Sequence, residues 1–312
     1  MNYEHIPVLL NEVLKYLDPR PGQNIIDATL GGGGYTSAII DRIKPNGKVL
    51  AIDLDADAIE HFKILTLALS QRDRVTTAQG NFAHIDKIIS NHKFPAPDGI
   101  VADLGLSSYE LEHRGISFQT NQPLDMRFDR SQQTDAKFIL NNYDQKRLEK
   151  IFNEYGEEKF SGKIVRKILE NRNKKIEIKH TDQLYQIITD ALPKPVKHKA
   201  ADSARRIFQA LRIEVNHELE NLSDFLPKAF DLLVPGGRMA AVSFHSLEDR
   251  IVKQFFVGLT KGCVCPPEFP QCLCGRNPKG KILTKKPVTA SDVETKNNPR
   301  SNPAKLRAII KL

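Results

Sequence analysis

The chain has 312 residues, of which 40% are hydrophobic and 27% are charged. This balance provides enough apolar surface for one or two folded domains and argues against a globally disordered chain. No apolar run approaches the ~18 residues of a transmembrane helix. Met1 to Leu10 contain no basic segment leading into an apolar stretch, so we expect no secretory signal. Four cysteines are too few for a disulfide scaffold and predict a reducing, cytoplasmic setting.

The first hundred residues alternate strand-like and helix-like segments. Short apolar runs predict strands at Asn24–Asp27, Val49–Asp53, Val75–Ala78 and Gly99–Asp103. Helices are predicted between them, from Thr36 to Ile43 and from Ala56 to Leu69. Strands separated by helices indicate right-handed βαβ units and a parallel sheet.

The alternation stops after Ser108. The segments from Tyr109 to Ala201 are charged and helix-like, most clearly Leu148–Phe160, Lys163–Arg172 and Thr181–Ala191, and a Lys-rich stretch with Pro193 and Pro195 closes the region. A helix follows at Ser203–Leu219, a strand at Arg238–Phe244, a helix at Glu248–Phe256, and edge strands at Ile282–Leu283 and Leu306–Ile310. We therefore divide the chain into an α/β core (1–108), a helical insertion (109–201), and the second part of the core with a basic tail (202–312).

Charge is unevenly distributed. The net charge is +8, but residues 1–110 carry 10 basic and 14 acidic residues, a net of −4. The rest carry 36 basic and 24 acidic residues, a net of +12, with eight Lys and Arg against two Glu between Lys159 and Lys179. This pattern is either an ordinary solvated surface or the contact surface for a polyanion, and we expect nucleic acid.

A glycine cluster, Gly31 to Gly34, follows the first predicted strand. Glycines allow a backbone to pass close to a ligand, although a flexible turn would look the same. Asp53 lies 22 residues after Gly31, at the end of the second strand, where a carboxylate can accept both hydrogen bonds of a ribose diol. Asp53 could instead cap the next helix, as could Asp55. Together the cluster and the spacing predict a nucleoside cofactor.

The glycine loop favours S-adenosylmethionine over NAD. A dinucleotide fingerprint would place a third small residue where this sequence has Thr36. Asp27 precedes the loop and would repel a pyrophosphate, whereas it suits a sulfonium and an amine. Phe82, after the third strand, is either an adenine contact or a core residue. Asp103 ends the fourth strand, where we expect the methyl group.

Several strings together resemble one family, the ribosomal RNA small subunit methyltransferase H family of 16S ribosomal RNA cytosine-N4 methyltransferases. The specific strings are Pro123-Leu124-Asp125-Met126-Arg127 and Ser243-Phe244-His245-Ser246-Leu247-Glu248-Asp249-Arg250. The likeness runs nearly end to end and also includes His5 to Leu10, Asp27 to Tyr35, Asp103 to Ser108, Arg114 to Phe118, Phe208 to Asn216, Asn298 to Arg300 and Lys305 to Arg307.

The resemblance implies a class I, Rossmann-like α/β methyltransferase fold with a helical insertion, and S-adenosylmethionine as cofactor. It implies methyl transfer to a cytidine N4 in 16S ribosomal RNA within the small ribosomal subunit. The implied cofactor contacts are Gly33, Gly34, Tyr35, Asp53, Phe82, Asp103 and Glu110. Family members usually have His at the position of Tyr35 and Gln at that of Glu110, and the segment from Ser108 to Arg114 is about two residues shorter than expected.

The chemistry needs acceptors for the hydrogens of a weakly nucleophilic amine. Asp103 is the first candidate, helped by Ser107 or Ser108, although Asp103 could also contact only the cofactor. His245 is a candidate RNA contact or a structural loop residue, and Ser246 with Asp249 resembles a helix cap. Candidate phosphate contacts are Arg127, Arg212, Arg250 and Lys253, each of which could equally be ordinary surface.

Four cysteines form a paired cluster, Cys263-x-Cys265 and Cys272-x-Cys274. Structural zinc sites usually have two or more residues between paired ligands, so we predict free thiols and no metal. The competing functions are an NAD-dependent oxidoreductase, a non-catalytic ribosome-assembly factor and a DNA cytosine-N4 methyltransferase. The sequence does not indicate the oligomeric state.

Overall fold

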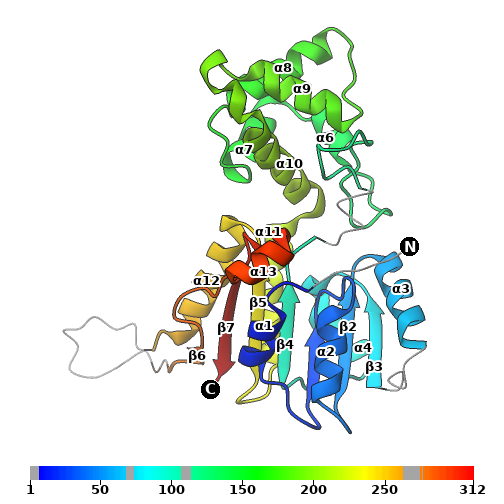
Figure 1. Ribbon diagram of the computed structural model, residues 1–312, viewed down its shortest axis with the longest axis vertical. Coiled ribbons are helices and arrows are strands. Elements are labelled where there is room, and N and C mark those ends of the chain that lie inside the picture. The colour runs from blue at the N-terminus through cyan, green and yellow to red at the C-terminus, as the bar shows by residue number, and fades with distance from the viewer. Residues whose placement is uncertain (1–6, 68–73, 107–113, 263–274, 276) are drawn as a thin grey trace, which may run out of the picture. The chain divides into compact units, whose positions relative to one another are not determined.

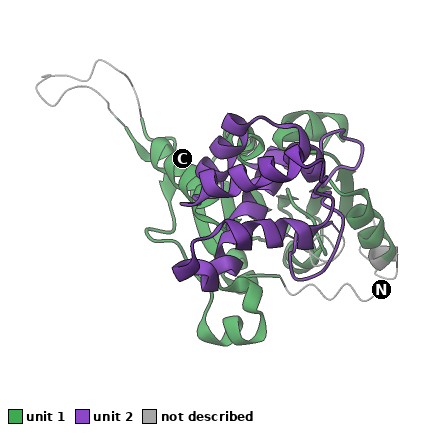
Figure 2. Cartoon of the chain, turned by 90° about the horizontal axis from the view of Figure 1, so that it is seen from above, with its two compact units in different colours: residues 1–105, 219–312 green, residues 106–218 purple. Residues whose placement is uncertain are grey.

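A computed structural model describes residues 7–67, 74–106, 114–262, 275 and 277–312. The chain forms two compact units, coloured separately in Figure 2. Unit 1 comprises residues 1–105 and 219–312, and unit 2 comprises residues 106–218. None of the helices in the described ranges has the length and apolarity needed to cross a lipid bilayer.

Unit 1 is built on a seven-stranded sheet with the order β3-β2-β1-β4-β5-β7-β6 (Figure 1). The strands are β1 (Asn24–Asp27), β2 (Lys48–Asp53), β3 (Val75–Gln79), β4 (Gly99–Asp103), β5 (Arg238–Ser243), β6 (Gly280–Ile282) and β7 (Lys305–Lys311). The first five are parallel, and β7 pairs antiparallel with both β5 and β6. The chain order reverses between β1 and β4, which makes this the switch point of the sheet.

The predicted strands of the first hundred residues are confirmed within one or two residues. Both C-terminal strands, β6 and β7, were expected at the edge of the sheet, and the structure differs for one of them. Of these two strands, β6 lies at an edge of the sheet and β7 does not, because β7 lies between β5 and β6. Leu306, Ala308 and Ile309 of β7 are fully buried, as expected of an interior strand.

Helices cover both faces of the sheet because its strands carry apolar side chains on both faces. One core contains Ile26, Leu50 and Ile100 and packs against α4 (Ile85–Asn91), α11 (Glu218–Leu232) and α12 (Ser246–Thr260). The other contains Ile25 and Val101 and packs against α1 (Leu10–Leu17), α2 (Gly34–Arg42) and α3 (Ala56–Leu67). Short helices complete the unit: η2 (Phe82–His84), α13 (Asp292–Asn297) and η4 (Pro299–Ser301).

Unit 2 is helical in its described residues. Its helices are α6 (Ala136–Asn142), α7 (Gln145–Glu154), α8 (Ser161–Asn173), α9 (Thr181–Ala191), η3 (Lys194–Lys199) and α10 (Ala200–Asn216). Side chains of Asp135 and Asp144 cap the first turns of α6 and α7, accepting hydrogen bonds from the backbone amides of Phe138 (2.6 Å) and Arg147 (2.8 Å). The helices enclose a core of their own.

The end of the helical unit differs from the sequence-based boundary at Ala201. In the structure α10 belongs to unit 2, which runs to Glu218. The reason is packing: Ala204, Ile207, Phe208 and Leu211 of α10 are buried in the core of unit 2. Of the prolines that resembled a boundary, Pro193 is the N-cap of η3 and Pro195 lies in its first turn, so both belong to a short helix inside the unit.

Candidate active site at the strand ends

Three of the parallel strands end in an aspartate. Asp27 of β1 pairs with Ala51 of β2 and with Val101 of β4. Asp53 and Asp103 therefore lie two residues further along the neighbouring strands. Because side chains alternate between the two faces of a strand, this spacing places all three carboxylates on the same face of the sheet. They surround the switch point, where open α/β sheets bind their ligands.

Asp27 is fully buried. Its carboxylate accepts hydrogen bonds from the Thr36 hydroxyl (2.7 Å) and from the backbone amide of Thr29 (3.3 Å). Burial raises the pKa of Asp27 to about 7, and the charges of Asp103 and Asp53 add to this rise. Thr36, which stands where a dinucleotide site would have a glycine, is therefore the residue that holds Asp27 in place.

Asp53 connects the two loops that follow β1 and β2. Its carboxylate accepts hydrogen bonds from the backbone amides of Gly31 (2.7 Å) and Asp55 (2.8 Å). The helix-capping role falls to Asp55, which accepts a hydrogen bond from the amide of Asp57 at the start of α3 (3.0 Å). Burial raises the pKa of Asp53 to about 6. Its carboxylate is thus fixed at the end of β2, in the place expected for a ribose contact.

Asp103 is held by two hydrogen bonds, one through its backbone amide and one through its carboxylate. Its amide donates to the Thr29 hydroxyl (2.6 Å), and its carboxylate accepts a hydrogen bond from the amide of Gly105 (3.1 Å). The Tyr35 hydroxyl lowers the pKa of Asp103, whereas its own hydrogen bond goes to the carbonyl of Val8. Burial raises the pKa of Asp103 to about 7, and the Glu248 carboxylate adds to the rise.

The glycine loop turns tightly into α2. Gly31 and Gly33 have φ angles of 49° and 76°, which favour glycine. A Cβ on Gly33 would lie 2.2 Å from the Phe62 ring, and one on Gly34 would lie 2.7 Å from Pro7. These two glycines thus permit close packing within the protein, a requirement that the sequence pattern alone did not reveal.

The remaining predicted site residues divide into described and undescribed positions. Phe82 begins η2 and makes an edge-to-face contact with Phe225 at a centroid distance of 5.0 Å. It is partly buried against the core of unit 1. The predicted residues Ser107, Ser108 and Glu110, and the four cysteines, lie outside the described residues.

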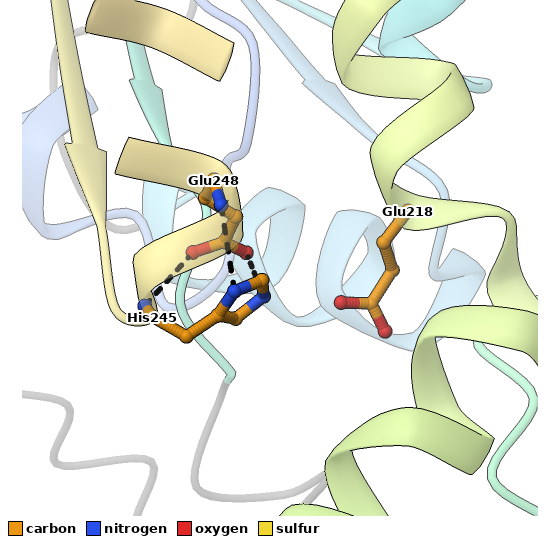
Figure 3. A group of neighbouring side chains, drawn as sticks. All are labelled: Glu218, His245 and Glu248. Carbon is orange, nitrogen blue, oxygen red and sulfur yellow. Dashed lines mark hydrogen bonds and ion pairs between the residues drawn. The ribbon is translucent and has the colours of Figure 1, made fainter. Parts of the chain in front are cut away.

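His245 caps α12 (Figure 3). Its ring Nδ1 accepts a hydrogen bond from the Glu248 amide at 3.4 Å, and the Glu248 carboxylate accepts one from the Phe244 amide at 2.8 Å. The cap therefore lies one residue before the predicted pair Ser246 and Asp249. The extended backbone of His245 places it at the N-cap position, and Glu248 is the acid three residues on that a capping box requires.

The predicted phosphate contacts have different surroundings. The Arg127 guanidinium binds Asp125 (2.6 Å) and the carbonyl of Gln132 (2.7 Å), and so organises its own loop. The Arg212 guanidinium makes two hydrogen bonds to Glu218, at 2.8 and 3.0 Å. Arg250 and Lys253 are exposed on α12. Arg250 and Lys253 are therefore exposed to solvent, whereas the guanidinium groups of Arg127 and Arg212 bind other groups of the protein.

Comparison with known proteins identifies the family. The chain matches the MraW methylase family over residues 2–312. The chain belongs to this family. Two relatives named ribosomal RNA small subunit methyltransferase H are 42% identical (Heliobacterium modesticaldum, 100% of both chains) and 45% identical (Halothermothrix orenii, 97% of both chains). A solved rRNA methylase from Streptococcus thermophilus aligns with a TM-score of 0.43 at 12% identity, covering 97% of this chain and 93% of that one.

This MraW methylase therefore has a class I, Rossmann-like methyltransferase fold, and its cofactor is S-adenosylmethionine. The strand ends fit that cofactor. Asp27, Asp53 and Asp103 surround one point, and among the described residues the hydrogen bonds to their carboxylates come from amides and a hydroxyl, not from lysine or arginine. A cluster of carboxylates without a cation suits a ligand that carries a sulfonium and an ammonium group.

Sequence reasoning missed four residues that organise the site of this methylase. The Thr36 hydroxyl binds the Asp27 carboxylate at the end of β1, and the Thr29 hydroxyl binds the amide of Asp103 at the end of β4. The available signal was that Thr29 closely follows Asp27 in the sequence. Gly105 allows the loop after β4 to pass Phe244, because a Cβ there would lie 2.8 Å from that ring. Glu248 shows its capping position in the sequence, but its proximity to Asp103 arises only in the folded chain.

Proposed function

We propose that this MraW methylase transfers the methyl group of S-adenosylmethionine to the N4 amine of a cytidine in 16S ribosomal RNA. The observation that carries the proposal is full-length identity above 40% to proteins named ribosomal RNA small subunit methyltransferase H. The choice of cytidine N4 comes from the sequence strings that resemble that family. We place the target in the decoding region of the small ribosomal subunit and the enzyme in the cytoplasm.

The cofactor contacts in this proposal are Gly33, Gly34, Tyr35, Asp53, Phe82, Asp103 and Glu110. Asp53 is assigned to the ribose hydroxyls because it ends β2, on the glycine-loop side of the switch point. Its carboxylate has two oxygens, each able to accept more than one hydrogen bond, so the bonds from Gly31 and Asp55 leave acceptor capacity for a diol. Phe82 is assigned to the adenine.

Asp103 is assigned to the reacting end. The bound cofactor supplies an electrophilic methyl group, and the protein must orient the amine toward it. The lone pair of a cytosine amine is delocalised into the ring, so a carboxylate that accepts an amine hydrogen favours the pyramidal geometry of attack. Once methylated, the amine loses its proton readily, and a carboxylate with a pKa of about 7 can receive it. Ser107 and Ser108 are assigned supporting roles.

Ribosomal RNA is a polyanion, and the basic side chains of the later two-thirds of the chain provide its contacts. Arg250 and Lys253 on α12 are exposed and remain our proposed phosphate contacts in unit 1. His245, Arg127 and Arg212 remain in the proposal as residues that shape the RNA-binding loops, because their side chains bind protein groups. In unit 2 the exposed helix η3 adds Lys194, Lys197 and Lys199.

The test offers methyl-labelled cofactor with small ribosomal subunits, naked 16S ribosomal RNA or DNA. We expect transfer to the cytidine N4, with assembled subunits as the best substrate, because a large basic surface suits a shaped target. Asp103→Ala should abolish transfer, and Asp86→Ala, an exposed aspartate on α4, should not. Mass spectrometry of nucleosides decides: label only on a ring carbon, a ribose or an adenine contradicts the proposal, as does label on DNA alone.

A further inference from the structure

A phenylalanine ring lies beside Asp103, just after the end of β5. A Cβ added to Gly105 would meet the Phe244 ring at 2.8 Å (Cε2) and 2.9 Å (Cζ), and it would meet Oδ1 of Asp103 at 3.0 Å. The ring and the carboxylate therefore approach the same point from two different strands. Phe244 is only partly buried against its core, so part of the ring is exposed.

The backbone places the Phe244 ring on the same face of the sheet as the carboxylates. Val242 of β5 lies opposite Asp103 of the parallel strand β4, and opposite residues point to the same face. Phe244 follows Val242 by two residues and packs against the same core. The Leu104 amide donates to the Val242 carbonyl at 2.9 Å, and the Phe244 amide donates to the Glu248 carboxylate at 2.8 Å. The chain is therefore fixed on both sides of the contact.

The order of the strands separates this ring from the proposed cofactor contacts. Across the switch point the sheet runs β2-β1-β4-β5 (Figure 1). Asp53 ends β2, the glycine loop follows β1 and Asp103 ends β4, so the proposed cofactor extends over these three strand ends with its methyl group at β4. Phe244 follows β5, on the far side of Asp103 from the ribose contact. A substrate amine approaches the methyl group from the side opposite the cofactor, which is the side of this ring.

An exposed aromatic ring at this position has the properties that a displaced base requires. An enzyme that modifies a base takes it out of its stack, because the reacting atom cannot be reached there. An aromatic side chain replaces the lost stacking and leaves the edge of the base free for hydrogen bonds. The atoms of Phe244 nearest to Gly105 belong to the ring edge. An aromatic edge carries partial positive charge, which suits the neighbouring Asp103 carboxylate.

We propose that the Phe244 ring is the platform on which the target cytosine stacks, with its N4 amine directed toward the Asp103 carboxylate. This role rests on the proposed transfer to cytidine N4 and adds the residue that holds the base. Phe82, the other aromatic residue of the proposed site, does not compete for the role, because it packs against the core on the opposite face of the sheet.

The experiment measures methyl transfer to small ribosomal subunits. Phe244→Leu removes the ring and keeps an apolar side chain. The kcat/KM for the subunits should fall about fivefold to a hundredfold, the range expected for the loss of one base–aromatic stack. The affinity for S-adenosylmethionine, measured by calorimetry, should be unchanged. Phe255→Leu is the matched control, because Phe255 is also partly buried but packs against the other core, and it should leave transfer unchanged.

Two outcomes of this experiment overturn the role of Phe244. The first is wild-type transfer by Phe244→Leu. The second is a loss of cofactor affinity that equals the loss of transfer, because the ring would then serve the cofactor or the core. Thermal denaturation of the two leucine variants shows whether removal of each ring costs similar stability, so that a difference in transfer is assigned to the base.

A second measurement needs no variant to fold. Small subunits reconstituted with RNA that contains 5-iodocytidine are mixed with the wild-type protein and S-adenosylhomocysteine, which allows binding without methyl transfer. Near-ultraviolet light couples an iodinated base to an aromatic ring stacked on it. Mass spectrometry should find the adduct on Phe244, and adducts confined to other residues overturn the proposal.

The role of Phe244 and the proposed function fail in different ways. A wild-type protein that places no methyl group on a cytidine N4 defeats the proposed function and the platform together. Cytidine methylation that is unaffected by Phe244→Leu defeats only the platform.

Discussion

At the scale of single residues, burial controls the strand-end aspartates. Asp27, Asp53 and Asp103 share one face of the sheet, and the hydrogen bonds that they accept come from amides and a hydroxyl. Those bonds favour the ionised form, but desolvation outweighs them in all three cases, and each pKa rises. The protein therefore holds a costly cluster of negative charge that a cationic ligand can neutralise.

This cost makes the stability of the cofactor-free protein depend on pH. The pKa of Asp27 rises from 3.8 to about 7 on folding, so the folded chain binds the proton more tightly than the unfolded chain. Its stabilising contribution is fully present below the unfolded pKa and is lost as the pH rises through the folded pKa. Asp27→Asn should therefore gain stability relative to the wild type as the pH rises from about 5 to about 8.5.

Urea denaturation at several pH values measures that difference in unfolding free energy. Asp41→Asn, an exposed aspartate on α2, is the control and should show no comparable trend above about pH 5. A difference between Asp27→Asn and the wild type that stays constant with pH would mean that the raised pKa of Asp27 is wrong.

A second residue-scale prediction concerns Asp53. Asp53→Asn should lower the affinity for S-adenosylmethionine about tenfold or more, because a hydrogen bond to a charged group contributes ~1.5–3 kcal/mol. Calorimetry of this variant tests the prediction, and Asp86→Asn, at an exposed position on α4, is the control. Unchanged affinity in folded Asp53→Asn would remove Asp53 from the cofactor site.

At the scale of elements, the N-terminal segment and the glycine loop form one packed unit. A Cβ added at Gly34 would meet the Cγ of Pro7 at 2.7 Å. Gly34→Ala should therefore cost ~1–3 kcal/mol of stability through overpacking. In the background of Pro7→Ala, which removes Cγ and Cδ, the same change should cost much less.

A double-mutant cycle in urea denaturation measures the coupling between the two positions. The control is Gly258→Ala on α12, where an added Cβ meets no atom within 4 Å. Gly236 also has open space, but its φ of 80° would strain any side chain. An equal cost of Gly34→Ala in both backgrounds would show that contact with Pro7 is not the cause.

Some helices and strands could be predicted from the sequence pattern, and others could not. Thr181–Ala191 was predicted to the residue, because its apolar side chains recur at helical spacing. The helix Glu218–Leu232 was not predicted, and Pro227 inside it obscures the pattern. The strand-end positions of Asp53 and Asp103 followed from the alternation of strands and helices. The partners of those aspartates did not, because Gly31 and Thr29 meet them only through tertiary packing.

At the scale of the whole molecule, charge is separated along the chain. The region after residue 110 carries a net charge of +12, and η3 displays Lys194, Lys197 and Lys199 to solvent. Only part of this charge is neutralised internally; Lys197, for example, lies 3.7 Å from Asp190. The exposed lysines of η3 therefore remain available to phosphates.

We expect binding to ribosomal RNA to weaken as salt rises, because each neutralised phosphate releases counterions. Changing Lys194, Lys197 and Lys199 together to Gln should reduce the slope of log affinity against log salt by about 2–3, at ~0.7–0.9 per contact. The control changes Lys15, Lys48 and Lys87 of unit 1 to Gln. Filter binding across a salt series decides: equal slopes for the two triple variants would exclude η3 from the RNA contact.

The place of β7 in the sheet has a consequence for biogenesis. This strand, residues 305–311, forms the ladder beside β5 and supports the edge strand β6, yet it is translated after the other six strands of the sheet. Residues 106–218 are continuous in the chain and contain their own core, so they can fold while translation is still in progress. The interrupted sheet can be completed only after residue 311 leaves the exit tunnel. The sheet that carries the strand-end aspartates therefore stays incomplete until β7 itself has emerged.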